Sequence, residues 1–559
     1  MFSEKQPLQR SNTRYRIFKG VIHILIAGAF LTYLYRLFES VPEPQPSVEA
    51  ILEPERSSQF RLKHVFHHGA GKYNKIHRRL DVTPEVLENR QWKVQHTPEK
   101  PVDPNNADSV LASEEPSRLF KDQDPWTAQL QIKTAEKPAR LRRLKERHTP
   151  HFLDSYLQYA MEVKGNPQKL NRIGLEWEPE QDVLLPDVED KDSVVALALI
   201  SSNAYVRLPL SDDEKDKLDW VDVGDPWDVD EENPDINFGW LEDGLRGHVF
   251  VSNDSKTVVI GIKGTSGAGL PGGGSDETSG NDKTNDNLLF SCCCARVGYM
   301  WTTVCDCYEK TYTCNQDCLE KELLRQDRYY QAALDLYRNV TKLYPPEDHD
   351  IWVTGHSLGG AVASLLGRTY GLPVVAFEAP GEMLATKRLH LPQAPGIPKH
   401  MEHIWHFGNT ADPIFMGVCN GASSSCSVAG YAMETACHTG KLCVYDVVGD
   451  LGWHVNLLNH RIHTVIDEII LKYNKTATCV DQPPCRDCFN WRYISKDDNE
   501  PDEPRLPHPL KPKPPKSSST QSSTPTDSAT STPTESEKPK KCLERTWYGW
   551  CKKWEGDED

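Results

Sequence analysis

Residues 351–362 read IWVTGHSLGGAV, and this stretch restricts the fold more than any other part of the sequence. The apolar and β-branched run before Gly355 is typical of a buried strand. Gly355 and Gly359 lie two residues on either side of Ser357, where a Cβ atom would collide with a tight strand-to-helix turn. The pattern therefore predicts a strand, a sharp turn that holds Ser357, and a helix that begins with small residues.

Segments on both sides of this turn continue an alternation of strands and helices. We expect strands at 257–265, 374–377 and 401–407, the first of them in a hairpin with the preceding RGHVFVSND, and a helix between 319 and 344. The segment VVALALI at 194–200 fits either a helix or a buried strand. This rhythm predicts an α/β fold, a parallel sheet with helices on its faces, with catalytic groups at the carboxyl ends of its strands.

A serine hydroxyl needs a base to become a good nucleophile, and the base needs an acid that orients it. In hydrolases with this turn, the acid and then the histidine follow the serine along the chain. Asp412 fits best as the acid, because it lies in the loop GNTADP directly after an expected strand. Glu378 also ends an expected strand, and Asp446 and Asp450 are further alternatives.

Two histidines, His460 and His463, stand at the front of the helix expected from NLLNHRIHTVIDEIILKY. We favour His460 as the base, because a side chain at the junction of loop and helix can lean over the edge of the sheet, and His463 remains the alternative. His438 and His454 fit less well. His460 and His463 also have the spacing of a metal pair, but no third ligand is identifiable nearby, and we expect no metal and no cofactor.

Two backbone N–H groups are the expected donors to the oxyanion of the reaction. One belongs to Leu358, which follows the serine, and the other to Thr265, at the end of the strand and turn VVIGIKGT. The segment 267–290 follows directly. Because an apolar acyl groove should be covered in water, we expect all or part of this segment to move as a lid, with a plain insertion as the alternative.

The amino-terminal region predicts a membrane anchor. Residues 17–38 would span about 33 Å as a helix, enough to cross a bilayer. No small-residue cleavage site follows, so an anchor fits better than a cleaved signal peptide. Basic residues precede the segment and acidic residues follow it, which predicts a type II membrane protein whose main part is luminal. Three glycosylation sequons, at Asn253, Asn339 and Asn474, agree with that topology.

Composition divides the chain into six parts. We expect a cytosolic tail at 1–16, the transmembrane signal anchor at 17–38, a luminal stem at 39–150, the catalytic domain at 151–495, a disordered Pro/Ser/Thr-rich linker at 496–541 and a small Cys/Trp tail at 542–559. The stem carries two basic islands, at 61–80 and 139–150. Each could contact anionic lipid head groups or, more simply, form a solvated helix face or a segment that packs on the enzyme body.

Charge and cysteine content narrow the partners and the compartment. The formal net charge of −17 argues against a nucleic-acid partner. The 16 cysteines would indicate a metal or cluster site in a cytosolic protein. In the oxidising compartment that the anchor predicts, they indicate disulfides instead, with pairings that the sequence does not reveal.

These residues carry a resemblance to a known family. GHSLGG at 355–360, KGT at 263–265, NTADP at 409–413 and NHRIH at 459–463 resemble the motifs of the class 3 lipases, α/β-hydrolases that act on acylglycerols. The cysteine-rich block and the long stretches HIWHFGNTADPIFMGVCNGASSSCSVAGYAMETACHTG and HVFHHGAGKYNKIHRRLDV look like the fungal autophagy-related vacuolar lipases, and the likeness extends from the anchor to about residue 495.

The resemblance implies roles as well as a fold. It implies Ser357 as nucleophile, Asp412 as acid and His460 as base, although Asn459 and His463 depart from the usual neighbours of that histidine. It also implies phospholipid and triacylglycerol hydrolysis. The protein would travel through Golgi and endosomal multivesicular-body membranes to the vacuole lumen, and there lyse autophagic bodies, cytoplasm-to-vacuole bodies and multivesicular-body vesicles. Its partners would be membrane lipids, with phosphoinositides among them.

Two functions from other classes remain as alternatives. A membrane-anchored scaffold that kept the fold predicts no loss of function when Ser357 is replaced by alanine. A hydrolase of thioesters or peptides predicts activity on small soluble esters without a gain at a lipid surface. The set of serine, acid, histidine and oxyanion turn favours a lipase over the scaffold, and only substrate assays separate the second alternative from it.

Overall fold

The computed structural model divides the chain into two compact units, Met1–Asn499 and Glu500–Asp559, and each is described by itself. The structure describes residues 56–88, 109–110, 117–120, 124–179, 181–206, 220–224, 244–265, 276–295, 303–396, 402–495, 542–545 and 551–554. The predicted cytosolic tail, anchor and linker at 1–16, 17–38 and 496–541 lie outside these residues.

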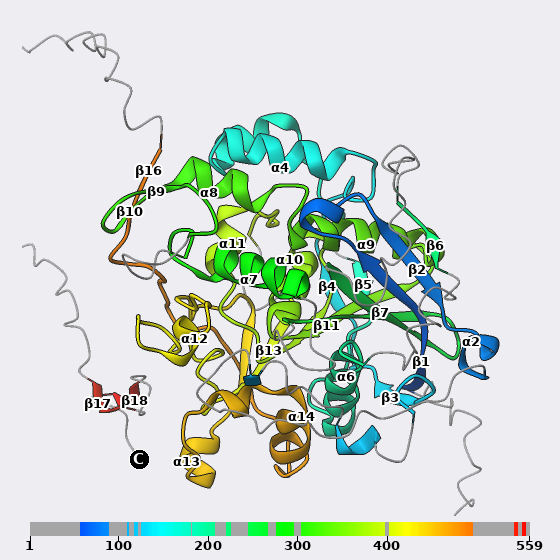
Figure 1. Ribbon diagram of the computed structural model, residues 1–559. Helices are drawn as coiled ribbons and strands as arrows, with labels where there is room; N and C mark the ends of the chain where they lie inside the picture. Colours follow the sequence, from blue (N-terminus) through cyan, green and yellow to red (C-terminus); the bar gives the residue numbers. More distant parts are fainter. Residues whose placement is uncertain are drawn as a thin grey trace, which may run out of the picture. The chain divides into compact units, whose positions relative to one another are not determined.

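An 11-stranded sheet forms the centre of the first unit (Figure 1). Its middle is parallel and consists, in spatial order, of β14 (Lys441–Tyr445), β13 (Ile404–Asn409), β12 (Val374–Phe377), β11 (Asp350–His356) and β8 (Thr257–Ile262). Antiparallel strands extend both edges: β15 (Cys479–Asp481) beside β14, and β7 (Leu245–Ser252), β1 (Ser57–His68), β2 (His77–Asp81) and β6 (Val221–Asp222) beyond β8, with β3 (Leu130–Lys133) also pairing with β1.

Helices cover both faces of the parallel strands, as the alternation of elements predicts (Figure 1). Ile351 and Val353 of β11 pack into one apolar cluster with α9 (Tyr329–Leu343) and α10 (Leu358–Tyr370). Trp352, between them, packs into a second cluster with α6 (Lys191–Asn203). Because side chains alternate along a strand, one buried run supplies both sides of the core.

The ambiguous segment 194–200 is a helix. It lies within α6, whose residues from Ser193 to Asn203 are all buried. The side chain of Asp190 accepts a hydrogen bond from the Ser193 N–H at 2.9 Å and so caps the helix start. The strand expected at 374–377 and the hairpin of β7 with β8 are confirmed.

The predicted boundary between stem and catalytic domain is wrong. Residues 57–81 supply β1 and β2 of the main sheet, and Phe60, Leu62 and Phe66 are buried in its core. Two arginines of the first basic island form ion pairs, Arg78 with Asp222 at 3.0 Å and Arg79 with Asp81 at 2.8 Å. This segment therefore packs on the enzyme body. The sequence did not reveal this, because the partner strand β7 lies about 180 residues further on, beyond the reach of local sequence patterns.

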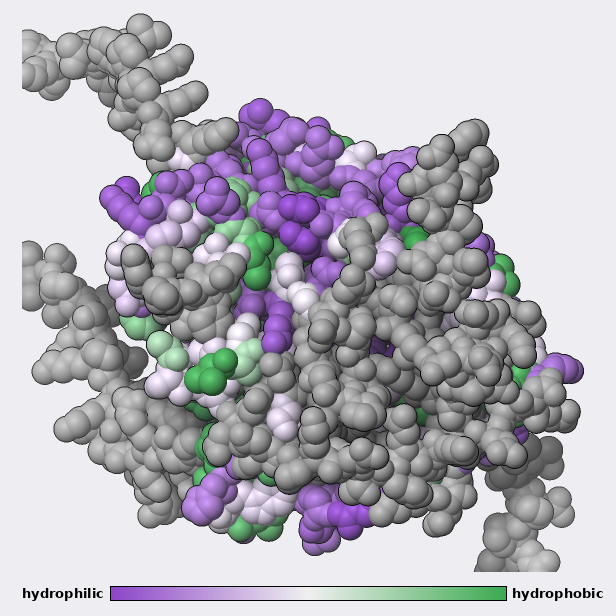
Figure 2. Space-filling model, in the orientation of Figure 1, coloured by the Kyte–Doolittle hydropathy of each residue, from purple (hydrophilic) through white to green (hydrophobic). Residues whose placement is uncertain are grey.

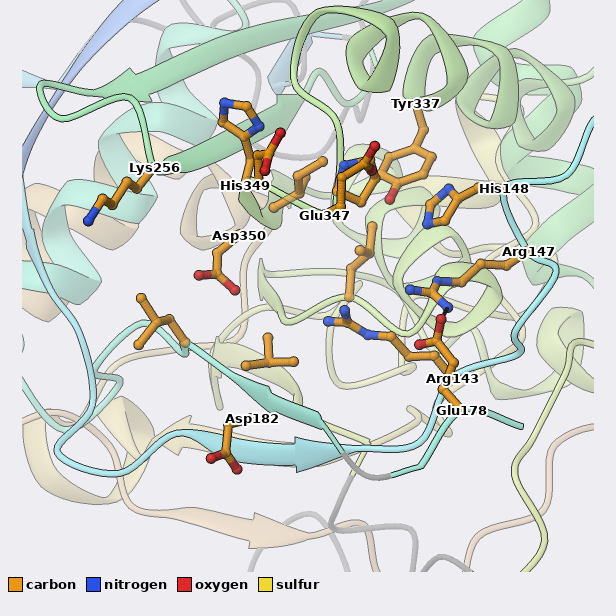
Figure 3. A pocket seen from close by; sticks show the side chains of 16 residues that line it. Arg143, Arg147, His148, Glu178, Asp182, Lys256, Tyr337, Glu347, His349 and Asp350 are labelled. Atoms are coloured by element: carbon orange, nitrogen blue, oxygen red, sulfur yellow. Dashed lines mark ion pairs between the residues drawn. The ribbon is translucent and has the colours of Figure 1, made fainter. Parts of the chain in front are cut away.

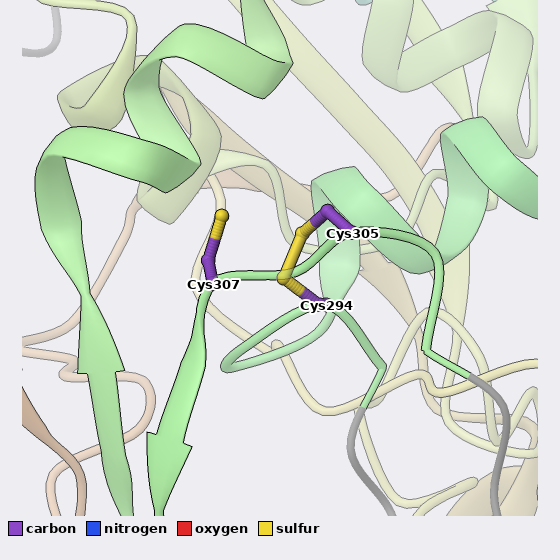
Figure 4. A group of neighbouring side chains, drawn as sticks. All are labelled: Cys294, Cys305 and Cys307. Atoms are coloured by element: carbon purple, nitrogen blue, oxygen red, sulfur yellow. A yellow bond between two sulfur atoms is a disulfide. The ribbon is translucent and has the colours of Figure 1, made fainter.

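Disulfides cross-link the second half of the first unit, as expected for a chain in an oxidising compartment. Cys294 and Cys305 form one of them, drawn with the neighbouring Cys307 in Figure 4. The described disulfides are Cys292–Cys488, Cys293–Cys314, Cys294–Cys305, Cys307–Cys318, Cys419–Cys426, Cys437–Cys485 and Cys443–Cys479. Each joins segments of the catalytic region and limits the unfolded ensemble.

Shorter elements complete the two units. The remaining helices are η1 (Gly71–Tyr73), α2 (Pro84–Glu88), η2 (Arg118–Phe120), α4 (Phe152–Glu162), α5 (Pro167–Leu170), η3 (Asn171–Ile173), α7 (Asp276–Phe290), α8 (Gln316–Leu323), α11 (Met383–Arg388), α12 (Ser425–Val428), α13 (Val447–Leu451), η6 (Leu457–His460), α14 (Ile462–Thr464) and the π-helix η7 (Val465–Ile470). The remaining strands are β4 (Ala139–Leu141), β5 (Gln181–Val183), β9 (Tyr308–Lys310), β10 (Thr313–Asn315), β16 (Arg492–Ile494) and, as an antiparallel pair in the second unit, β17 (Cys542–Arg545) and β18 (Cys551–Trp554). Among the described helices, none combines the length and apolar character needed to cross a bilayer.

Candidate active site

Ser357 occupies a strained turn between β11 and α10. Its backbone has φ 55° and ψ −132°, a conformation that costs a non-glycine residue about 1–3 kcal/mol. A Cβ on Gly355 would lie 2.5 Å from the Gly359 carbonyl oxygen, and one on Gly359 would lie 2.2 Å from the Ile262 carbonyl oxygen. Both positions therefore require glycine, because the backbones approach too closely for a Cβ atom. These two glycines are the part of the turn that is visible in the sequence.

The structure brings together the three residues favoured from the sequence. His460 Nε2 lies 2.8 Å from Ser357 Oγ, and His460 Nδ1 lies 2.7 Å from Asp412 Oδ2. Asp412 and His460 are fully buried and Ser357 is 2% exposed. A hydrogen-bonded series of serine, imidazole and carboxylate is the arrangement in which the base can accept the hydroxyl proton.

Strand ends position each member of this series. Asp412 follows β13, and its Oδ1 accepts the Ile414 N–H at 2.8 Å, which leaves Oδ2 for the imidazole. His460 ends the turn η6 and turns its ring toward Ser357, whereas the alternative base His463 lies beyond it in α14. All three groups thus gather at the carboxyl edge of the parallel strands, where open α/β sheets place their ligand sites.

Glu378, an alternative acid in the sequence, lies beside Asp412 rather than beside the histidine. It follows β12 with φ 46° and is fully buried. Its carboxyl group accepts hydrogen bonds from Asn409, at 2.8 Å from Nδ2 and 3.2 Å from the backbone N–H. Asn409 Nδ2 also donates to the Asn459 carbonyl at 3.0 Å, next to His460. Glu378 thus connects the acid loop with the histidine loop.

The two carboxyl groups hold different charges. Burial raises the pKa of Glu378 well above its usual value, and the charge of Asp412 beside it raises that pKa further, which favours the protonated form of Glu378. Burial alone would raise the pKa of Asp412, but His460 and the hydrogen bond from Glu378 outweigh it and hold that pKa below its usual value. The negative charge is therefore kept on the carboxylate that faces the imidazole.

His356 and Tyr205 support the base from the other side, and the sequence analysis missed both. His356 Nε2 lies 2.7 Å from the His460 carbonyl oxygen, and Tyr205 OH lies 2.8 Å from His356 Nδ1. The imidazoles of His356 and His460 are in contact, with ring centroids 4.9 Å apart. His356, at the variable second position of the G-x-S-x-G motif, thus holds the loop of His460 in place. A motif that allows any residue at this position does not reveal such a role.

The expected oxyanion turn lies against Ser357. A Cβ on Gly264 would lie 3.2 Å from Ser357 Cβ, which places Thr265 beside the serine. Leu358 is the first residue of α10, so its N–H has no acceptor within the helix. Thr265 Oγ1 donates to Asp286 Oδ2 at 2.7 Å. Burial raises the pKa of Asp286 well above its usual value.

The second half of the expected lid is a packed helix. Leu288, Leu289 and Phe290 of α7 are buried in the core. Asn287 at the same end accepts the Ala432 N–H at 2.6 Å and donates to the Gly430 carbonyl at 2.8 Å. The carboxyl-terminal part of the segment 267–290 is therefore packed into the core, and residues 266–275 lie outside the described residues.

A cavity of about 560 Å³ lies at the amino-terminal ends of β8 and β11, opposite the carboxyl end of β11 that Ser357 follows. Figure 3 shows the side chains that line it. Lys256, just before β8, and Asp350, the first residue of β11, line it. Arg143 and Arg147 of the second basic island also line it, and Arg147 pairs with Glu178 at 2.7 Å. This cavity lies away from the serine, and the second island, like the first, packs on the enzyme body.

The predicted glycosylation sites differ in access. Asn253 and Asn474 are exposed. Asn339 is buried in α9, and its Nδ2 lies 2.8 Å from His77 Nδ1 and 3.2 Å from the Asp335 carbonyl oxygen. A glycan on that nitrogen is incompatible with the folded structure, because the side chain faces the interior.

Comparison with known proteins supplies the family. The family model described as Lipase (class 3) matches residues 286–370, which include the Ser357 turn. A protein of Meyerozyma guilliermondii named "Putative lipase ATG15" is 65% identical over 95% of this chain and 93% of its own length. Proteins of the same name from Candida albicans and Saccharomyces cerevisiae are 59% and 49% identical, over 98% and 86% of this chain and 95% and 88% of their own lengths. The chain belongs to the lipase ATG15 family.

Membership in the lipase ATG15 family makes the chain a lipase, an ester hydrolase with an α/β fold. Among solved structures, the Lip2 lipase from Yarrowia lipolytica aligns over 38% of this chain and 63% of its own, with 16% identity and a TM-score of 0.19. This score is too low to support an argument, so the fold rests on the sheet order and the family relationship.

Proposed function

We propose that the chain is a membrane-anchored luminal serine lipase that hydrolyses phospholipid and triacylglycerol esters. In this proposal Ser357 is the nucleophile, His460 the general base and Asp412 the acid that orients it. The observation that carries the proposal is the hydrogen-bonded series from Ser357 Oγ through the His460 imidazole to Asp412, at the carboxyl edge of the sheet.

The geometry supports a two-step acyl transfer. Ser357 Oγ attacks the ester carbonyl carbon while His460 Nε2 takes the hydroxyl proton, and the carbonyl oxygen becomes an oxyanion that the Thr265 and Leu358 amides receive. The tetrahedral intermediate then expels the alcohol, which leaves with the proton from His460. Water attacks the acyl-enzyme by the same route, releases the fatty acid and restores the serine. His356 and Glu378 keep the imidazole and the carboxylate in position.

Location and substrate surface belong to the same proposal. The basic-then-acidic flanks of residues 17–38 and the disulfides support a type II protein in an oxidising lumen, with glycans on Asn253 and Asn474. The relatives' name supports a role in autophagy. We therefore infer delivery through Golgi and multivesicular bodies to the vacuole, where the enzyme lyses autophagic bodies, cytoplasm-to-vacuole bodies and multivesicular-body vesicles by hydrolysing their membrane lipids.

Fatty-acid release by the full chain in detergent tests this proposal. Substrates are phospholipid vesicles, a triacylglycerol emulsion and a small soluble ester, each from pH 4.5 to 8. Replacement of Ser357 by alanine should lower kcat by about 10⁴–10⁶ on the lipids. Ser364→Ala is the matched control, because Ser364 is a buried serine of the same helix whose hydroxyl donates to the Gly360 carbonyl at 3.0 Å.

The substrates separate the alternatives. Equal release by wild type and Ser357→Ala would contradict the catalytic role and favour a scaffold. Hydrolysis of the soluble ester without a gain on vesicles or emulsion would contradict the lipid substrate while keeping the serine chemistry.

A further inference from the structure

A second group of acid and imidazole side chains lies buried in the first unit. It consists of Glu382, directly before α11, His406, within β13, and His438, just before β14. Glu382 and His406 are fully buried and His438 is 2% exposed. Each side chain offers one nitrogen or oxygen, and these atoms all lie within 4.8 Å of one another. None of the three belongs to the hydrogen-bonded series of Ser357.

Several of these atoms have no hydrogen-bond partner among the described residues: Glu382 Oε2, His438 Nδ1 and both ring nitrogens of His406. His406 Nε2 lies 3.2 Å from Glu382 Oε1 but is not aligned for a hydrogen bond. Leaving a buried polar atom unpaired costs about 1–3 kcal/mol, so a group with several such atoms needs an explanation.

Neighbouring backbone and side chains orient the group as ligands. His438 Nε2 lies 2.8 Å from the Ala379 carbonyl oxygen, which can only accept, so the ring carries its proton on Nε2 and keeps the Nδ1 lone pair bare. The Thr439 N–H, at 2.9 Å, and the Thr439 hydroxyl both donate to Glu382 Oε1. Support of this kind, a histidine N–H on a carbonyl and a hydrogen-bonded carboxylate, is typical of metal sites.

We propose that Glu382, His406 and His438 bind one zinc ion. Two imidazole nitrogens and one carboxylate oxygen are ligands that Zn²⁺ prefers, with water or the second Glu382 oxygen in the fourth position. Tetrahedral zinc places its ligand atoms roughly 3.4 Å apart. The ligand atoms of the group all lie within 4.8 Å of one another, so no pair has to close by more than about 1.4 Å, which side-chain rotation can supply.

A buried ion pair explains less of the geometry than a metal ion. If His406 were protonated and paired with Glu382, His438 Nδ1 and Glu382 Oε2 would still have no hydrogen-bond partner among the described residues. A zinc ion uses the lone pairs of Glu382, of His438 and of one His406 nitrogen at once. The ion would also offset the charge of the Glu382 carboxylate, which among the described residues has only His406 within salt-bridge distance.

Two other groups of close ligand atoms do not compete. Cys294, Cys305 and Cys307 lie together, but Figure 4 shows Cys294 bonded to Cys305, and Cys307 is bonded to Cys318. Cys437 and Cys485, near Asp487, likewise form a disulfide. A disulfide sulfur is not the thiolate that zinc requires, so the Glu382 group alone among these three keeps its ligands available.

The proposed zinc would connect three segments that frame the active site. Glu382 follows the loop that holds Glu378, His406 lies on the strand that leads to Asn409 and Asp412, and His438 follows the Cys437–Cys485 disulfide. Because the group is buried, zinc would have to enter during folding in the secretory route rather than exchange with the folded protein.

The metal content of the full chain tests the proposal. The protein is made in a secreting host with zinc in the medium, purified in detergent without a polyhistidine tag or chelators, and analysed by mass spectrometry for elemental metals. We expect about one zinc per chain in the wild type and less than about a tenth of that in His406→Gln and His438→Gln. His248→Gln is the matched control and should keep its zinc, because His248 is a fully buried histidine of β7 outside the group.

Refolding of the wild type keeps the test valid if the glutamine variants fail to fold. Chain unfolded with a chelator, with its disulfides intact, and then refolded with Co²⁺ should develop the visible absorption of a tetrahedral nitrogen and oxygen site, and one equivalent of Zn²⁺ should abolish it. The proposal is overturned if the purified wild type holds less than about a tenth of an equivalent of any metal and takes up neither ion on refolding. It is also overturned if His438→Gln keeps as much zinc as the wild type.

Discussion

Two buried groups of carboxylate and imidazole lie at neighbouring strands of the same sheet, and they differ in how their polar atoms are satisfied. In the Ser357 group, both nitrogens of His460 have protein partners, at 2.8 and 2.7 Å. In the Glu382 group, neither nitrogen of His406 has a hydrogen-bond partner among the described residues, and Nε2 makes only an unaligned contact with Glu382 Oε1 at 3.2 Å. A closed hydrogen-bonded series lets the imidazole accept the serine proton while the carboxylate orients the ring, whereas converging unpaired lone pairs require a further partner. The same residue types therefore support chemistry in one place and ligand binding in the other.

The largest effect is expected when the negative charge of the Ser357 group alone is removed. Asp412→Asn should lower kcat on lipid by about 10⁴, because the amide stabilises the wrong imidazole tautomer, while the zinc content and the thermal midpoint stay near those of the wild type. Activity assays and metal analysis on one preparation check this. A loss of zinc equal to the loss of activity would show that the two groups are one site.

The next largest effect concerns Glu378. Its alanine and glutamine variants distinguish the loss of a hydrogen-bond donor from the loss of an ionisable group. Glu378→Ala leaves Asp412 without a buried donor, which costs about 1–3 kcal/mol and should lower kcat about tenfold to a hundredfold. Glu378→Gln keeps an N–H donor and should stay within a few-fold of the wild type. It should also keep its activity at alkaline pH, where ionisation of Glu378 would place two carboxylates side by side in the wild type. Equal losses in both variants would contradict the donor role.

Metal removal should change stability rather than chemistry. A ligand at a hundredfold its dissociation constant stabilises the folded state by about 2.7 kcal/mol, so protein refolded without zinc should unfold at a lower denaturant concentration than protein refolded with it. Its kcat per folded molecule should remain within a few-fold of the wild type. Equal unfolding midpoints with and without zinc would contradict metal binding by the Glu382 group.

The Ser357 group and the Glu382 group differ in how far they could be predicted from the sequence. The Ser357 turn was predictable because its strand, glycines and helix are adjacent, and Asp412 and His460 follow in the usual order. The Glu382 group was not, because residues 382, 406 and 438 converge only when three strands align, and a histidine inside an apolar strand resembles an ordinary core residue. Strands β1 and β2 escaped detection for the same reason, since their register is set by β7, far along the chain.

The last prediction is a pH dependence at Asp286, whose charge state differs between the folded and unfolded chain. Its folded pKa is raised by burial, so the folded state binds more protons than the unfolded state above about pH 4, and stability falls as pH rises. Asp286→Asn removes this dependence. Relative to the wild type, the variant should therefore gain up to about 1.4 kcal/mol of unfolding free energy per pH unit above pH 4. Denaturant unfolding at pH 4, 5.5 and 7 checks this, and a constant difference would contradict it.

Covalent labelling tests the central claim, that Ser357 is the nucleophile, most directly. The full chain in detergent is treated with a fluorophosphonate, which bonds to activated serine hydroxyls, and the modified residue is located by peptide mass spectrometry. We expect one adduct, on Ser357, with parallel loss of lipase activity, and no adduct on that peptide in Ser357→Ala or His460→Ala. Complete loss of activity with the adduct on another residue, or full activity with Ser357 modified, would contradict it.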